Sequence, residues 1–474
     1  MESNFKMECF RHKLLGNKQC ILEVTSDKII ITNISDQPNK RNELDINYNL
    51  FVDFKVKKQQ LYAIGLITNK HHWYYSDNEN LINLKQILGA RVVFKGVNTL
   101  YNPLQQIGQG TFSNVYLLQS KLNNLEYFAC KCLDKAQVHE KIGRQGLFDE
   151  IQAMVALKHQ NIAELLEVFE GEVSYYMVMQ YYDLEFTDIL KELNNEDIHI
   201  IFKQLVTAVN FMHENGFMHR DLKPENIMFS DSIYFLKLID FGLTTRDSGR
   251  CKCGTPGYVA PEILNLDTKI NEYNEKCDIF SLGVIFYKML TLDDLFQGSN
   301  HEEILENNAR CNVNFDMLNG NQKIPKQAID LLKKMLQIDP TQRIDSKSIL
   351  EHQYFTVEEQ THNNTINSLN QLSRKHSSVL KILSPIQKKN GMFTSPFSMH
   401  EDDCIEKEAI MQPIPTVIMK GGIAKSRTPG RTRKLSKDTT KKYQTSDFED
   451  VILEIKQSNY RPPKPSQLSE MYNK

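Results

Sequence analysis

A glycine-rich run is the first place in the chain where residue types and spacing point to chemistry. It comprises Ile107, Gly108, Gln109, Gly110, Thr111, Phe112, Ser113, Asn114 and Val115. Glycine lets a hairpin fold tightly over phosphate groups, with main-chain N–H groups directed at them. Glycine pairs are also common in ordinary turns, so the run becomes informative only through the residues that follow it.

A lysine and a glutamate follow this run at distances that suit a phosphate site. Lys131 ends a strand-like stretch, and Glu150 lies in the helical stretch 147–157. A lysine in such a strand reaches phosphates only if its ammonium group is fixed, and Glu150 is the candidate partner. Met154 and Leu157 follow Glu150 at helical spacing and would pack that helix on the sheet. As isolated residues, the two charges would be ordinary surface groups.

The strongest signal is the run Phe-Met-His-Arg-Asp-Leu-Lys-Pro-Glu-Asn at 217–226, followed by Asp-Phe-Gly at 240–242. With these motifs in this order, the chain resembles the eukaryotic protein kinases, specifically their Ser/Thr branch, over residues 101–355. The resemblance implies an enzyme that uses ATP and Mg²⁺ to transfer the γ-phosphate to serine or threonine of protein substrates. It also implies an α+β fold of two lobes, one with an antiparallel sheet and a helix, the other mainly helical.

The resemblance gives each matching residue a role. Asp221 matches the aspartate that accepts the proton of the substrate hydroxyl, and Lys223 matches the lysine near the γ-phosphate. Asn226 and Asp240 match the two magnesium ligands, whose oxygen atoms suit this hard cation. His219 is structural in that family, so we assign it no catalytic role.

Other matching residues would hold the nucleotide. Lys131 and Glu150 match the ion pair that positions the α- and β-phosphates below the glycine-rich run. The remaining contacts implied by the resemblance come from the side chains of Val115 and Ala129 on the faces of adenine, the gatekeeper Met179, and the backbone from Gln180 to Tyr182.

Downstream motifs agree with the resemblance, and one residue of the phosphate loop departs from it. Asp278 resembles the buried helix aspartate that anchors the catalytic loop. Arg343 resembles the partner of Glu262, at the end of the activation segment. Ser113 stands at the third glycine position of the phosphate loop, and its Cβ makes the loop less permissive.

Cysteine occupies a second unusual position. Cys251 lies two residues before Cys253, where many kinases regulated on this segment carry a phosphorylatable threonine, whose phosphate Arg220 usually receives. This puts phosphorylation-dependent ordering of the segment in doubt. The C-x-C spacing is also not the C-x₂₋₄-C of structural zinc sites. A redox-sensitive Cys251 is the hypothesis that its predicted loop position favours.

Residues 1–98 are expected to form a small β-rich domain. A β-branched run at 28–32 and the alternation of apolar and polar side chains at 52–56 predict strands, and leucines at helical spacing predict a helix over 81–88. This element order resembles a pleckstrin-homology-like module. Residues 1–95 hold fourteen Lys/Arg and ten Asp/Glu, a net charge of +4. We expect an anionic lipid headgroup or a protein as the partner, and a packing domain without a lipid ligand as the alternative.

The composition shifts from about residue 356 onward. Asn, Ser, Thr, Lys and Gln dominate residues 356–474, which predicts a mainly disordered regulatory tail. Residues 371–383 are basic and carry leucines in a pattern that suits an amphipathic helix. They resemble the autoregulatory helix of calcium/calmodulin-regulated kinases, so calmodulin is a candidate partner; a solvated linker is the alternative.

Length and charge exclude other classes of protein. The chain has 474 residues and a net charge of -2, with 41% hydrophobic and 24% charged residues. These values are typical of a globular protein and give no argument for nucleic-acid binding. No apolar run is long enough to span a bilayer, and nine cysteines without a signal peptide predict reduced thiols. We therefore expect a cytoplasmic protein, with a peripheral membrane or a nuclear location as the alternatives.

Acidic residues beside the expected active site favour a basic substrate. Glu225 lies in the catalytic loop and Glu185 is a second candidate contact, which together predict a mild preference for Arg-x-x-Ser/Thr. Two other interpretations remain open. One is a pseudokinase scaffold, which the intact motifs argue against; the other is a membrane-recruited adaptor that acts mainly through residues 1–98.

Overall fold

The computed structural model describes residues 5–13, 16–34, 41–110, 113–230, 235–246, 248–266 and 272–356. Two expected phosphate-loop residues, Thr111 and Phe112, lie outside these ranges. The predictions made for the tail 356–474, apart from Thr356 itself, also lie outside the described residues.

The first part of the chain is rich in strands, as its sequence predicts. Seven strands are followed by a helix, a 3₁₀ turn, a two-residue strand and a short helix, and we call this part (residues 5–100) the N-terminal module. Its elements are β1 (Phe5–Lys13), β2 (Gly16–Val24), β3 (Lys28–Asn33), β4 (Arg41–Asp45), β5 (Phe51–Lys57), β6 (Gln60–Ile67), β7 (His71–Tyr75), α1 (Asn78–Leu88), η1 (Gly89–Arg91), β8 (Val93–Phe94) and α2 (Val97–Leu100).

Local sequence explains the helix of this module. Asp77 accepts a hydrogen bond from the backbone N–H of Asn80 and so caps the first turn of α1. Leu81, Leu84 and Leu88 are buried on one face, and their burial against the strands is what holds the helix. The helical spacing in the sequence therefore predicts both the helix and its buried side.

The next part of the chain is a five-stranded antiparallel sheet with two helices. The expected helix is present as the longer of the two, and a short helix that the sequence analysis did not predict precedes it. The elements are β9 (Tyr101–Gln109), β10 (Ser113–Ser120), β11 (Tyr127–Asp134), α3 (Lys135–Lys141), α4 (Gly143–Ala156), β12 (Leu165–Glu170) and β13 (Ser174–Gln180).

One continuous sheet joins these two parts, which the sequence analysis did not foresee. Among the described residues the strand order is β4-β3-β2-β1-β7-β6-β5-β8-β12-β13-β11-β10-β9. The two-residue strand β8 makes the connection, because it pairs in parallel with β5 on one side and with β12 on the other. The rings of Phe94 in β8 and Phe169 in β12 lie 5.5 Å apart within a buried cluster that spans both parts.

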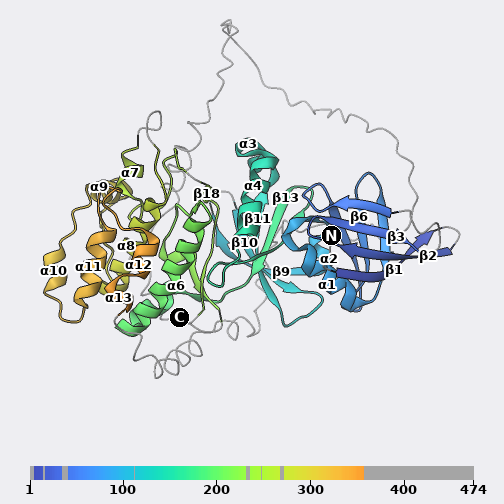
Figure 1. The fold of residues 1–474 in the computed structure, drawn as a ribbon, viewed down its shortest axis with the longest axis horizontal. Coiled ribbons are helices and arrows are strands. Elements are labelled where there is room, and N and C mark those ends of the chain that lie inside the picture. The colour runs from blue at the N-terminus through green and yellow to red at the C-terminus, as the bar shows by residue number, and fades with distance from the viewer. Residues whose placement is uncertain are drawn as a thin grey trace, which may run out of the picture.

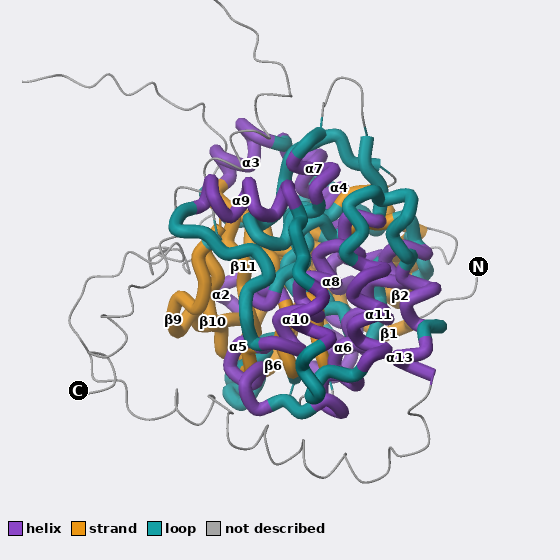
Figure 2. The backbone as a smooth tube through the Cα atoms, turned by 90° about the vertical axis from the view of Figure 1, so that its left-hand side faces the viewer, coloured by secondary structure: helices purple, strands orange, loops and turns teal. Residues whose placement is uncertain are grey.

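The last part is mainly helical and forms the opposite end of the molecule (Figure 1). In the view of Figure 2, turned by 90°, helices α8, α10, α11 and α13 face the reader. The helices and 3₁₀ turns are α5 (Phe186–Ile189), η2 (Leu190–Glu192), α6 (Asn195–Glu214), η3 (Pro224–Asn226), α7 (Pro261–Leu264), α8 (Lys276–Thr291), α9 (His301–Arg310), α10 (Phe315–Asn319), α11 (Lys326–Met335), α12 (Ser346–Leu350) and α13 (Gln353–Thr356). Its short strands are β14 (Leu184–Glu185), β15 (Phe217–Met218), β16 (Ile227–Phe229), β17 (Leu236–Leu238) and β18 (Thr245–Arg246).

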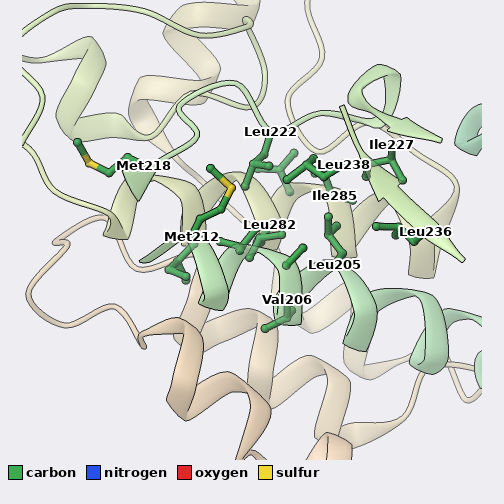
Figure 3. Packing of buried hydrophobic residues seen from close by; sticks show 14 of the residues in the cluster. Leu205, Val206, Met212, Met218, Leu222, Ile227, Leu236, Leu238, Leu282 and Ile285 are labelled. Carbon is green, nitrogen blue, oxygen red and sulfur yellow. The ribbon is translucent and has the colours of Figure 1, made fainter. Parts of the chain in front are cut away.

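A buried core beneath the short strands fixes the loops between them. Figure 3 shows Leu205 and Met212 of α6, Leu222 and Leu238 near the strands, and Leu282 of α8 packed together. Burial of large aliphatic side chains contributes about 2 kcal/mol each, so this core holds the strand ends rigidly. The expected α+β fold with a sheet-rich part and a helical part is confirmed. In the described ranges, no helix combines the length and apolarity that a membrane crossing requires.

Candidate active site

Asp221 lies at the centre of a small network of polar side chains. Its side chain is buried, at 5% exposure, in the loop that follows β15. The Lys223 ammonium lies 2.9 Å from Asp221 Oδ2, and the Thr255 hydroxyl donates to Asp221 Oδ1 at 2.6 Å. Lys223 also donates to the Thr255 hydroxyl at 3.0 Å. Each of the three side chains therefore contacts the other two, which fixes the direction of the Asp221 carboxylate.

The backbone before Asp221 is anchored by a buried carboxylate in α8. Asp278 accepts hydrogen bonds from the backbone N–H groups of His219 and Arg220, both at 2.8 Å, and lies 2.9 Å from His213 Nε2. Burial opposes the charge of Asp278, but the hydrogen bond to His213, the nearby histidines and the Arg220 backbone N–H together outweigh it and lower the pKa of the carboxyl. The anchor holds Arg220 at a φ of +67°, a conformation that L-residues rarely adopt.

The histidine of this loop is not arranged for proton transfer. Burial lowers the pKa of His219, whose ring is fully buried and lies 5.3 Å from the ring of Phe241. A neutral, enclosed imidazole packs the loop against Phe241. The structural interpretation of His219 made from the sequence agrees with this placement.

Two oxygen-bearing side chains lie together because the hairpin of β16 and β17 joins them. Asn226 ends η3 just before β16, and Asp240 follows β17; the backbone N–H of Ile239 donates to Asn226 O at 2.9 Å. Asn226 Nδ2 donates to Asp221 O at 2.8 Å, which commits the amide nitrogen and leaves an oxygen as the ligand atom. With the half-exposed Asp240 carboxylate, this donor set of oxygens fits a hard divalent cation such as Mg²⁺.

Lys131 contacts the aspartate of this pair. Lys131 in β11 lies 2.9 Å from Asp240 Oδ1. Burial opposes the ammonium charge, but the carboxylates of Asp240, Glu150 and Asp221 together outweigh it and raise the pKa of Lys131. Glu150 of α4 lies on the same side, because a Cβ added to Gly242 would meet both Lys131 Nζ at 3.3 Å and Glu150 Oε1 at 3.9 Å. The Lys131–Glu150 ion pair implied by the resemblance is not formed among the described contacts; Lys131 pairs with Asp240.

Burial is the main influence on the protonation of Glu150. The apolar surroundings of α4 raise the pKa of this carboxyl, and the nearby charge of Lys131 opposes the rise. When it is ionised, a buried glutamate attracts a nearby cation more strongly than an exposed glutamate does, because less water screens the two charges. Glu150 thus acts on Lys131 through its charge, without an ion pair among the described contacts.

The glycine-rich run forms the end of the β9–β10 hairpin. Gly108 pairs with Val115, and the backbone N–H of Gly110 donates to Ser113 O at 2.7 Å, which closes the turn. Ile107, Gln109 and Asn114 lie in the same two strands, and Asn114 pairs with Gln109. The turn therefore stands directly over the strand that carries Lys131, since Val115 pairs with Lys131 in β11.

The strands behind this hairpin bring the remaining expected nucleotide contacts into register. Ala129 of β11 pairs with Met179 of β13, one position from Gln180 at the end of that strand. Tyr182 follows, is buried, and donates from its hydroxyl to Gln180 Oε1 at 3.4 Å. Val115, Ala129 and Met179 are all partly buried on adjacent strands, which suits contact with a flat apolar ring.

A buried ion pair holds the end of the segment that follows Thr255 against the helical part of the chain. Arg343 donates two hydrogen bonds to Glu262, at 2.6 and 2.9 Å, and its side chain is fully buried. Such a bidentate pair fixes the relative position of the two segments that carry it. Loss of one partner would leave a buried charge uncompensated. The pairing predicted from the sequence is present.

Sequence reasoning missed two residues of this site. Thr255 has no role in the sequence-based prediction, although its hydroxyl joins Asp221 to Lys223. Tyr273 was not noticed, although its hydroxyl contacts Arg220 at 3.2 Å and Cys251 O at 2.8 Å. A threonine next to glycine and proline is a usable signal, whereas nothing in the local sequence marks Tyr273.

The comparisons with known proteins agree with this geometry. A family model described as "Protein kinase domain" matches residues 101–355. A calcium-dependent protein kinase 4 of Plasmodium berghei is 36% identical over 282 residues, which cover 57% of this chain and 52% of that protein. A calcium/calmodulin-dependent protein kinase type 1 of Caenorhabditis briggsae is 34% identical over 259 residues, 53% of this chain and 71% of that protein. The serine/threonine-protein kinase cds1 of Schizosaccharomyces pombe is 31% identical over 281 residues, 56% of this chain and 60% of that protein. The chain thus spans about half the length of the Plasmodium relative.

Proposed function

Because the chain belongs to the protein kinase family, we propose that it transfers the γ-phosphate of ATP to serine or threonine hydroxyls of protein substrates. The observation that carries this proposal is the common location of Asp221, Asn226, Asp240 and Lys131 around one site. Phosphoryl transfer needs positioned charges rather than covalent chemistry, and this site supplies an ammonium group and three oxygen-bearing side chains.

Each residue has a task that its contacts support. Asp221, held by Thr255, would accept the proton of the substrate hydroxyl. Lys223, 2.9 Å from Asp221, would stabilise negative charge on the transferring phosphate. Asn226 and Asp240 would hold Mg²⁺, which neutralises phosphate charge when bound, and Lys131 would orient the phosphates beneath the hairpin turn.

Transfer of radiolabelled phosphate from ATP to mixed Ser/Thr peptides tests the proposal. We expect Asp221→Ala to lower turnover on the order of 10²-fold or more, because proton acceptance and carboxylate positioning are both lost. The matched control is Glu302→Ala, which removes an exposed carboxylate in α9 that has no described contact with Asp221, Lys223 or Thr255. Equal transfer by the wild type and Asp221→Ala would reject the catalytic assignment and leave the pseudokinase interpretation.

A preference for basic residues before the target serine or threonine is the finer part of the proposal. Glu225, beside Asn226, and Glu185 in β14 are both exposed and present carboxylates next to the site. We expect the ratio of kcat/KM for Arg-x-x-Ser over Ala-x-x-Ser peptides to fall by about five-fold in Glu225→Gln, as loss of an exposed charge pair predicts. A wild-type enzyme that prefers acidic or proline-directed peptides would contradict this preference.

The N-terminal module is proposed to bind an anionic group. A pocket of about 210 Å³ lies at the end of its strands, lined by Asn42, Lys70, His72 and Tyr74 among others. Arg11 lies 2.7 Å from His72 and adds positive charge nearby. The test is sedimentation of the whole chain with vesicles that contain an acidic lipid, compared with neutral vesicles. Lys70→Glu should weaken binding. Lys57→Glu, at the end of β5 where Lys57 pairs with Gln60, should not.

Calmodulin binding is proposed from the relatives and the sequence of the tail. Relatives of this chain are named calcium/calmodulin-dependent kinases. The candidate segment 371–383 lies outside the described residues. Calcium-dependent retention of the whole chain on immobilised calmodulin, lost when residues 371–383 are deleted, is the expected result. Equal retention with calcium and with a chelator would contradict it.

A further inference from the structure

Arg220 carries a positive charge that, in the described part of the chain, is surrounded by uncharged partners. Its guanidinium donates to Leu243 O at 2.6 Å and contacts Cys251 Sγ at 2.9 Å and the Tyr273 hydroxyl at 3.2 Å. Within the described ranges no carboxylate forms an ion pair with this guanidinium. A part-buried cation in such surroundings favours the ionisation of a neighbouring acid, and a thiol is more acidic than the tyrosine hydroxyl that also contacts the guanidinium.

Two thiols lie beside this guanidinium. Cys251 and Cys253 are buried, at 8% and 3% exposure, and their sulfur atoms lie 3.9 Å apart with Cys251 donating to Cys253. The hydrogen bond from Cys251, together with the charge of Arg220, lowers the pKa of Cys253, and the same hydrogen bond raises the pKa of Cys251. The contacts thus divide the pair into an ionisable sulfur and a proton donor.

The chain contains a second cysteine pair that serves as a built-in comparison. Cys130 and Cys132 have the same C-x-C spacing, the same sulfur separation of 3.9 Å and similar burial. They lie in β11, however, and no described cation donates to either sulfur; burial raises the pKa of Cys130. The sulfur–sulfur distance is therefore the same in the two pairs. The pairs differ in that the guanidinium of Arg220 contacts Cys251.

The backbone also differs between the two pairs. Cys251 lies at a bend of an irregular segment, whereas Cys130 and Cys132 are fixed in a central strand between β10 and β13. Alternate residues of a strand are about 6.6 Å apart along its axis, near the upper limit of the Cα separation that a disulfide spans. A bent segment can shorten this separation, but a strand paired on both sides cannot.

We propose that Cys251 and Cys253 form a peroxide-reactive dithiol, which hydrogen peroxide converts to a disulfide next to the catalytic loop. The Cys253 sulfur attacks one peroxide oxygen, the O–O bond breaks, and a sulfenic acid and one water result. The Cys251 sulfur then attacks the Cys253 sulfur, the S–O bond breaks, and the Cys251 proton leaves with the hydroxide as a second water. The two thiols lose two electrons, and the peroxide gains them.

Quantitative alkylation of the whole protein tests this step without reference to kinase activity. The chain is treated with limiting peroxide, alkylated with iodoacetamide, digested with a glutamate-specific protease and analysed by mass spectrometry. We expect the 251–253 peptide to lose both labels and two hydrogen atoms about ten-fold faster than the 130–132 peptide, the advantage of a larger thiolate fraction. Dithiothreitol should restore both labels.

Three variants assign the parts of the pair. Cys251→Ser should leave a Cys253 sulfenic acid that dimedone traps, and Cys253→Ser should abolish the linked peptide. Cys132→Ser is the matched control and should change neither result. Equal oxidation rates of the two pairs, or full labelling of Cys251 and Cys253 when Cys130 and Cys132 are oxidised, would overturn the proposal.

Discussion

Thr255 shows how one hydroxyl group can order two charged side chains. It donates to Asp221 and accepts from Lys223, so neither charge can turn away without breaking a hydrogen bond. A carboxylate with a fixed direction is a better proton acceptor for a positioned hydroxyl, because the reacting atoms already lie in line. Thr255 is therefore a positioning residue for the proposed reaction.

Removal of this hydroxyl is expected to lower kcat about 10-fold in Thr255→Val, because a small misplacement of reacting groups is costly. The variant keeps the volume of the side chain, so the loop should fold. Thr255→Ser keeps the hydroxyl and should retain most activity. Steady-state peptide phosphorylation measures both, and the positioning role fails if the two variants are equally active.

The buried carboxylate of Asp278 makes a prediction about pH. Its pKa lies below the ordinary value of 3.8, so the folded state prefers the charged form. That stabilisation is present above the unfolded pKa and is lost as pH falls through the folded one. Asp278→Asn should cost about 3 kcal/mol at pH 7, since backbone donors lose a charged acceptor. In urea unfolding the difference from wild type should shrink as pH falls below about 4. The exposed Asp294→Asn should show no comparable cost, and a constant difference at all pH values would contradict the assignment.

Individual residue roles were predictable where a motif fixes them, and unpredictable where distances decide. The order of Lys131, Asp221, Asn226 and Asp240 along the chain predicts a shared site, and the structure brings their side chains together. The sequence cannot say which carboxylate Lys131 contacts, because Asp240 and Glu150 both lie near its ammonium group. That choice depends on where α4 lies and on which rotamer each of the three side chains adopts.

At the scale of the elements, helix α4 contacts both the N-terminal module and the five-stranded part that follows it. Its outer face meets the N-terminal module: the rings of Tyr48 and Phe148 stack at 4.5 Å, and Arg144 donates to Tyr48 O at 2.8 Å. Arg144 also lies 3.6 Å from Glu170. The inner face of the same helix carries Glu150. Because contacts with the module help to hold the helix, they also help to fix the position of that carboxylate.

Loss of the stacked ring should therefore reduce activity at a distance. Tyr48→Ala removes an aromatic pair worth about 1 kcal/mol, which corresponds to about a five-fold fall in kcat/KM if the contact holds α4 in its working position. Hydrogen exchange of residues 143–156 should rise in the same variant. Tyr48→Phe keeps the ring and should match the wild type. An increase in activity in Tyr48→Ala would mean that the contact restrains the enzyme.

Elements with a clear period were predictable, and short ones were not. The strands at 28–32 and 52–56 and the helix over 81–88 carry patterns of five to eight residues, and all are present. Strand β8 has two residues, so it has no period, yet it connects the sheets. The short helix α3 follows Asp134, whose side chain accepts from Gln137 N–H at 2.9 Å; that capping signal was present but was not used.

At the scale of the whole molecule, the module and the five-stranded part share a core rather than a linker. Glu167 in β12 is buried and contacts both Lys85 of α1 and the hydroxyl of Tyr101, the latter at 3.0 Å. Phe169, on the same strand, packs on Phe94. The division at residues 98–101 stays a prediction, and the contacts across it are those of a continuous fold.

Deletion of residues 1–100 should therefore destabilise what remains. It would expose the edge of β12 and buried side chains such as Phe169 and Val178, each worth about 2 kcal/mol of burial. We expect the melting temperature of the shortened chain to fall by about 10 °C or more and its light scattering to rise, since an unpaired edge strand invites association. In the intact chain, the module and the parts that follow it up to residue 356 should unfold together in a single thermal transition. A shortened chain that is monomeric and equally stable would contradict the shared core.

The two-residue strand also has a consequence for synthesis on the ribosome. The module emerges first, so the nascent chain carries a finished sheet whose last strand, β8, offers an unpaired row of backbone groups while translation continues. β12 leaves the exit tunnel later and docks by pairing Phe169 with Phe94. We therefore expect the module to serve as a template on which the catalytic part folds, with β12 covering the exposed edge of β8 once it has been synthesised.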